Sequence, residues 1–183
     1  SEADYRKLLA ENKARQVLHE AAKLPKLVVE DYPSLSFPKG TEAQNARNIT
    51  TAQQFAAKYT PGVDRLYNVL APGEADRDKL TSLRWQAEFD LAMGRASALK
   101  ARLDGYNSML AALKRGKNFQ NASSTTWNLE AADAFETESS IRKLAERARL
   151  YLDRVAKEHP GTPWAKIAED ELKNPLGWTW KES

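Results

Sequence analysis

The chain has 183 residues, of which 42% are hydrophobic and 29% charged, so it can form one domain with a packed core. It carries 28 Lys and Arg against 25 Asp and Glu, a net charge of +3, and the two signs alternate along the chain, which argues against a nucleic-acid binder. The absence of cysteine excludes disulfides, thiol catalysis and thiolate metal sites.

The sequence contains no candidate membrane segment. Mean hydropathy is −0.66, and no run approaches the ~20 apolar residues that a spanning helix needs. The charged stretch that begins at Ser1 contains no signal peptide, and we expect Ser1 to lie inside a longer protein. We therefore expect a soluble segment with no membrane insertion, and its cellular compartment stays open.

The first 71 residues predict two helical regions joined by an extended linker. The spacing of apolar residues predicts one helix over residues 2–24 and a second over 41–59, with Thr41 as its N-cap. Thr60 and Pro61 have the pattern of a new helix start, so a further piece over 61–71 is expected after a kink. The linker 25–40 contains several prolines and apolar residues, and we expect it to cover the helical core.

The clearest periodicity lies in the middle of the chain. Nine apolar residues recur at alternating intervals of four and three: Trp85, Phe89, Ala92, Ala96, Leu99, Leu103, Tyr106, Leu110 and Leu113. This pattern predicts one long helix over about 83–115, after Ser82 and before Gly116. Gly94 and Gly105 lie outside this stripe, where close packing or a bend is expected.

The remaining sequence predicts an irregular loop over 116–137, a helix over 138–159 and a short helix over 163–173, followed by an apolar tail. The predicted fold is all-α: an elongated antiparallel helical bundle around the long helix. We expect a single domain over 1–183, divided into a bundle (1–115), the loop (116–137) and a helix pair with a Trp-rich tail (138–183).

The sequence shows no motif for catalysis, cofactor binding or metal binding. His19 and His159 are the only histidines, and the HExxH, GxSxG and phosphate-loop patterns do not occur. No catalytic, cofactor-binding or metal-ligating residue is therefore expected. A helical enzyme of an uncatalogued type remains an alternative, and it would require a pocket that places one histidine near an acidic side chain.

Four of the five tryptophans fall in predicted loops or terminal segments. They are the candidate partner-binding residues Trp127, Trp164, Trp178 and Trp180. Aromatic side chains in such places anchor partners or stack on sugars, and they also cap the open ends of a thin helical core.

An ordered set of segments resembles a known family. The segments are Arg84–Arg95 (RWQAEFDLAMGR), Gly105–Leu110, His159–Ala165 and Pro175–Trp178. They are similar to the helical C-terminal region of planctomycete and related bacterial von Willebrand factor type A domain proteins, over residues 75–183. The resemblance implies a bacterial protein in which an N-terminal adhesion-type domain precedes this region, and it implies no catalytic residues here.

A second resemblance is to tetratricopeptide repeats, and it concerns the joint between the last two predicted helices. It is carried by Ala148, Leu152, Val155, His159, Pro160, Ala165, Ala168 and Leu172. One such unit is not an array, because these repeats stack in threes or more.

These observations leave three functional hypotheses. The first is a non-catalytic interaction or scaffold module that contacts a protein partner, its own N-terminal adhesion-type domain or a second copy in a homodimer. The second is a binding module for a glycan or small ligand that uses exposed tryptophans, and the third is the helical enzyme.

Overall fold

The computed structural model of the chain describes residues 1–135 and 139–183. In this part the helices are α1 (Glu2–Ala10), α2 (Lys13–Ala22), α3 (Glu42–Leu70), the 3₁₀ helix η1 (Ala71–Lys79), α4 (Leu83–Lys114), α5 (Ser139–Glu158) and α6 (Pro163–Leu172). The strands are β1 (Ser36–Pro38), β2 (Thr126–Ala132) and β3 (Gly177–Glu182). No helix in these ranges has the length and apolar character to cross a membrane.

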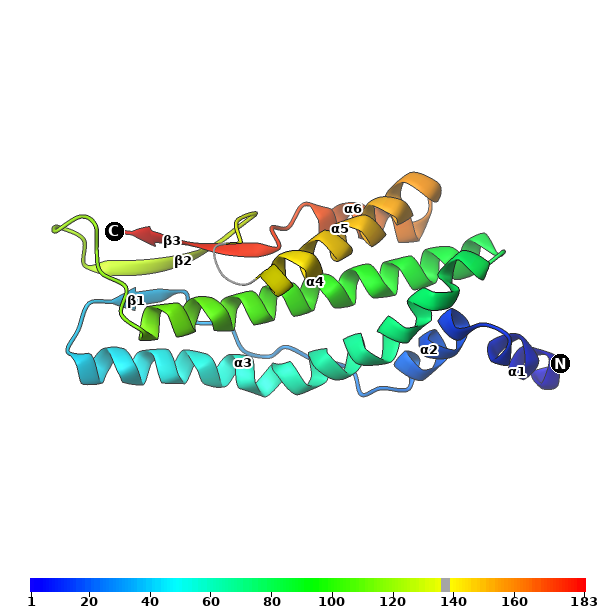
Figure 1. Ribbon diagram of the computed structural model, residues 1–183, viewed down its shortest axis with the longest axis horizontal. Helices are drawn as coiled ribbons and strands as arrows, with labels where there is room; N and C mark the ends of the chain where they lie inside the picture. Colours follow the sequence, from blue (N-terminus) through cyan, green and yellow to red (C-terminus); the bar gives the residue numbers. More distant parts are fainter. Residues whose placement is uncertain (136–138) are drawn as a thin grey trace.

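Helix α4 is the central element of the molecule. Figure 1 shows α3 lying along one side of it and α5 with α6 along another, while α2 and the sheet occupy opposite ends. The observed bounds Leu83–Lys114 confirm the helix predicted over 83–115. Helices α5 and α6 likewise lie where they were predicted, apart from residue 138, which lies outside the described residues.

Helix α4 is buried on two faces, because neighbouring helices cover both. Tyr106 and Leu110 of the predicted stripe pack against α3 and the sheet. On another face, Ala98 and Ala101 pack against alanines of α5. The heptad pattern therefore identified only one of the two buried surfaces.

The two glycines of α4 mark close approaches, as predicted. A Cβ atom on Gly94 would lie 2.8 Å from the Leu152 side chain of α5, and one on Gly105 would lie 3.1 Å from the Trp178 ring of β3. A larger residue at Gly94 would force α4 and α5 apart, and one at Gly105 would displace the indole.

The all-α prediction is wrong in one respect, because three strands form an antiparallel sheet of order β1-β2-β3. Phe37 pairs with Trp127, and Leu129 pairs with Trp180. The expected irregular loop over 116–137 therefore contains a strand at 126–132, and its last two residues lie outside the described ones. The expected tail forms β3.

The helix predicted over 2–24 is two helices. Asn12 interrupts it, because its side-chain oxygen accepts from the Arg15 backbone N–H (3.2 Å) and caps α2, while its Nδ2 donates to the Asp76 carbonyl (3.0 Å). In contrast, the helix start expected at Pro61 does not exist. Pro61 lies inside the continuous helix α3, and the Thr60 hydroxyl donates to the Ala56 carbonyl (2.7 Å).

The linker before α3 is held by two tyrosines. The Tyr59 hydroxyl accepts from the backbone N–H groups of Glu30 (3.2 Å) and Asp31 (3.4 Å), and the Tyr106 hydroxyl donates to the Ser34 carbonyl (2.9 Å). The linker covers the core only in part, since Tyr32 is 95% exposed. The expectation that the linker covers the helical core is therefore confirmed at Phe37, which is buried, and wrong at Tyr32.

Candidate functional site

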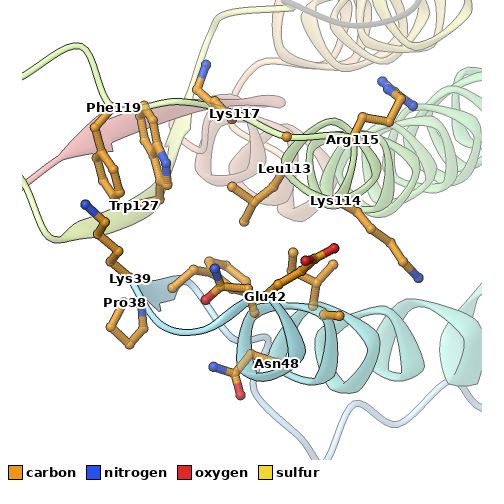
Figure 2. Close-up of a pocket in the computed structure, with 15 residues that line it drawn as sticks. Pro38, Lys39, Glu42, Asn48, Leu113, Lys114, Arg115, Lys117, Phe119 and Trp127 are labelled. Atoms are coloured by element: carbon orange, nitrogen blue, oxygen red, sulfur yellow. The ribbon is translucent and has the colours of Figure 1, made fainter.

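A cleft of about 610 Å³ lies at the end of the molecule where the sheet meets α3 and α4. It is formed by β1, the first two turns of α3, the last turn of α4 with the loop that follows, and Trp127 of β2 (Figure 2). Its volume falls in the range of sites that bind small molecules or short peptide segments.

The floor of the cleft is apolar. It contains Phe37, Ile49 and Trp127, which are 4–6% exposed and belong to the core cluster shared by α3, α4 and the sheet. Leu113 of α4 and Phe119 of the following loop pack against this cluster but remain half-buried. The cleft therefore presents incompletely covered apolar surface beside a closed core.

Phe119 and Trp127 form a parallel stack, with ring centroids 4.9 Å apart and an angle of 8° between the planes. The Lys39 ammonium lies 5.9 Å from the Phe119 ring, and the Lys117 ammonium lies 5.0 Å from the Trp127 ring. Figure 2 shows Phe119 and Lys117 on opposite sides of Trp127, so both faces of this indole are occupied. These cation–π contacts stabilise one wall of the cleft.

The cleft is strongly basic. Four cationic side chains line it (Lys39, Lys114, Arg115 and Lys117) against the single carboxylate of Glu42. Figure 2 shows the cations spread around the rim rather than gathered at one point. Lys114 and Arg115 also lie at the C-terminal end of α4, where positive charge is favourable. The whole chain carries a net charge of only +3, so this rim is a local concentration of positive charge.

The loop that supplies Lys117 and Phe119 is held by the last strand. The Glu182 carboxylate accepts from the backbone N–H groups of Gln120 (2.6 Å) and Asn121 (2.9 Å). These hydrogen bonds hold the pKa of Glu182 below its ordinary value, because they stabilise the charged form. The C-terminal strand thereby positions one wall of the cleft.

Three of the four candidate tryptophans come together near this end of the molecule. Trp127 lines the cleft, and Trp180 packs edge-on against it with centroids 6.1 Å apart. Trp178 packs on Tyr106 and donates from its indole nitrogen to the Arg102 carbonyl (2.9 Å). Trp164 lies elsewhere, against the apolar cluster between α5 and α6.

None of these indoles is an exposed stacking platform. Trp127 is 6% exposed, and Trp164, Trp178 and Trp180 are half-buried. Their positions match the structural interpretation, in which they close the core, more than the interpretation as coplanar sugar-binding rings.

The two histidines are far from the cleft lining. His19 lies half-buried on α2 beside Tyr5, with ring centroids 6.2 Å apart, and His159 is buried at the end of α5. Within residues 1–135 and 139–183, no group of three or more His, Cys, Asp or Glu side chains is placed to share a metal ion. His19 lines a separate pocket of about 440 Å³ together with Glu88 of α4, and the cleft of about 610 Å³ is the larger of these two candidate sites.

Sequence reasoning found Trp127 but missed the rest of the cleft. The missed residues are Phe37, Lys39, Leu113, Lys117 and Phe119 in their role as cleft lining. A signal was present, because three cations and an aromatic residue follow one another within the six residues 114–119.

Comparison with known protein families, curated proteins and solved structures finds no significant match to this chain.

Proposed function

We propose that the chain is a non-catalytic interaction module that binds an acidic segment of a protein partner in this cleft. One observation carries the proposal: a peptide-sized cleft whose rim holds four cations and one carboxylate. A negatively charged segment would neutralise the rim.

A protein partner suits this arrangement better than a nucleic acid. Nucleic-acid affinity arises from a continuous basic track along the phosphate backbone, and here the cations surround a cleft of about 610 Å³. The resemblance to von Willebrand factor type A domain proteins suggests two sources for such a segment, a separate protein or the adhesion-type domain of the same chain. The α5–α6 pair, which resembles a tetratricopeptide unit, packs against α4 and supports the scaffold rather than the cleft.

The proposal is tested by binding of a labelled Glu-rich peptide, measured by fluorescence anisotropy at low and at physiological salt. A Lys-rich peptide of equal length is the matched ligand control. We expect the Glu-rich peptide to bind and its affinity to fall as salt rises, because exposed charge pairs are screened over about 8 Å at physiological ionic strength. Equal binding of the two peptides would refute the proposal.

The protein variant for this test is Lys114→Gln/Arg115→Gln. Each exposed ion pair contributes about 0.2–1 kcal/mol, so losing two of them weakens peptide binding by roughly twofold to thirtyfold. Lys143→Gln is the matched control, because Lys143 is an exposed cation on α5 and not part of the cleft. The control should bind as the unchanged protein does.

A further inference from the structure

The apolar surface of the cleft and its charged rim occur together, and charge alone does not explain this combination. Leu113 and Phe119 are half-buried, and they pack against the buried core cluster from the side that lines the cleft. Figure 2 shows Leu113 projecting from α4 into the space between α3 and the Phe119–Trp127 wall, with the labelled cations around it. A purely acidic ligand would neutralise the rim and leave this apolar surface uncovered.

The single carboxylate of the lining adds a directional constraint. Glu42 lies on the first turn of α3, whereas the cations lie just after β1, at the end of α4 and on the loop after it. A bound segment gains least by placing an acidic residue over Glu42, because two carboxylates repel each other. Its acidic residues are best placed on either side of a central uncharged residue that faces Ile49 and Leu113.

We infer that the segment bound by this cleft carries one large apolar side chain, flanked on both sides by acidic residues. The inference rests on the proposed function and names the class of segment that this function recognises. The apolar side chain covers Leu113 and Phe119, and the flanking carboxylates pair with rim cations, namely Lys39 and Lys117 beside the aromatic stack and Lys114 and Arg115 at the end of α4.

The spread of the cations favours a peptide over a single small anion. Lys39 and Lys117 flank the aromatic stack, while Arg115 lies at the C-cap of α4 (Figure 2). One carboxylate cannot contact both groups at once, whereas a peptide with acidic residues on both sides of an anchor can. The proposed occupant is therefore an extended segment of a partner protein.

The test compares three short peptides by isothermal titration calorimetry: a leucine flanked by glutamates, the same peptide with alanine in place of leucine, and the leucine peptide flanked by lysines. Burying a leucine side chain instead of an alanine methyl removes more apolar surface from water, which corresponds to about tenfold tighter binding. We expect the leucine–glutamate peptide to bind about tenfold tighter than the alanine–glutamate peptide, and the lysine-flanked peptide not to bind.

Two protein variants make the test specific to the cleft. Leu113→Ser should bring the leucine and alanine peptides to similar affinity while keeping the salt dependence of both, and circular dichroism verifies that it is folded. Glu42→Gln should tighten binding of both glutamate peptides by about twofold to fivefold, because it removes one repulsive charge. A gain of affinity cannot result from unfolding.

The outcomes separate the two proposals. If the leucine and alanine peptides bind equally with the same salt dependence, the anchor is wrong and the acidic-segment function stands. If neither glutamate peptide binds, the proposed function itself is wrong. Light scattering tests whether the chain forms a dimer. If it does, and if the leucine peptide does not dissociate the dimer, the cleft is occupied by a second copy of the chain and the peptide inference is wrong.

Discussion

Asp90 of α4 offers the sharpest test of how this fold is held together. Its side chain is 0% exposed, and it lies between η1 and α5. Arg77 of η1 donates from Nε to both carboxylate oxygens (2.9 and 3.1 Å) and also from Nη2, and Arg154 of α5 lies 3.5 Å away. One buried carboxylate therefore joins α4 to the preceding η1 and to α5, which is distant in sequence.

Replacing Asp90 by Asn keeps the size of the side chain but removes the charge that both arginines face. Breaking a buried ion pair from one side costs about 3–5 kcal/mol, because the remaining charge is desolvated without compensation. Arg77 is only 11% exposed, and the Glu158 carboxylate, 3.3 Å from its Nη2, is 50% exposed and compensates the charge only in part. At about 2–4 °C per kcal/mol for a domain of this size, the melting temperature of Asp90→Asn should fall by roughly 6–20 °C.

The assay is urea unfolding monitored by circular dichroism, and it is applied to Asp90→Asn, Arg77→Met and the double variant. The double variant should lose less free energy of unfolding than the two single variants lose together, and the difference, the coupling energy, should exceed about 1 kcal/mol. Asp78→Asn is the matched control, because Asp78 lies 4.0 Å from the Arg77 guanidinium but is 96% exposed, and it should change stability by less than about 0.5 kcal/mol. Additive single effects, or an unchanged urea midpoint for Asp90→Asn, would refute the reasoning.

Three further perturbations have defined outcomes. Burial raises the pKa of Tyr106 from 10.0 to about 12 against the opposing effect of its hydrogen bond to Ser34, so the folded chain keeps this proton longer than the unfolded chain. The contribution of Tyr106 to the free energy of unfolding should therefore be constant below about pH 10 and should decrease by about 3 kcal/mol as the pH rises to about 12. In urea titrations, Tyr106→Phe should not show this decrease. Gly177→Ala should disrupt β3, because the added Cβ would lie 2.1 Å from the Ala134 carbonyl oxygen, and hydrogen exchange of the β2–β3 amides would report it. Glu182→Gln should weaken binding of the acidic peptide, since it loosens the loop at the cleft, while leaving the melting temperature within a few degrees.

The helices were predictable because their signals are local. The stripe of α4 and the cap at Thr41 lie within a few residues of the elements they define, and the structure places Thr41 as the N-cap of α3. The break at Asn12 was missed because the apolar spacing continues across it. The break is stabilised in part by the hydrogen bond from Asn12 to the Asp76 carbonyl. Because the two residues are 64 positions apart, no local sequence pattern indicates this contact.

The strands were missed for a different reason, because their pattern was present and was given too little weight. Buried Trp127 and Leu129 alternate with more exposed neighbours in β2, and Trp178 and Trp180 alternate in β3. This period of two is typical of a strand with one covered face. Among long helical repeats, two short alternating stretches resemble a loop and a tail, and the sheet forms only because β2 pairs with β3 on one side and with β1 on the other.

The cleft could not be predicted in the same way, because it is made by three segments that meet only in the folded chain. The fold nevertheless explains the positions of some of the cations at the cleft and not of others. Lys114 and Arg115 stabilise the carboxyl end of α4, so their presence needs no ligand. Lys39 instead precedes Thr41, the N-cap of α3, where a positive charge opposes the helix dipole. The Phe119 ring, 5.9 Å from the Lys39 ammonium, offsets this unfavourable interaction only weakly. Among the four rim cations, Lys39 is therefore the one whose position the fold explains least and the binding of an acidic ligand explains best.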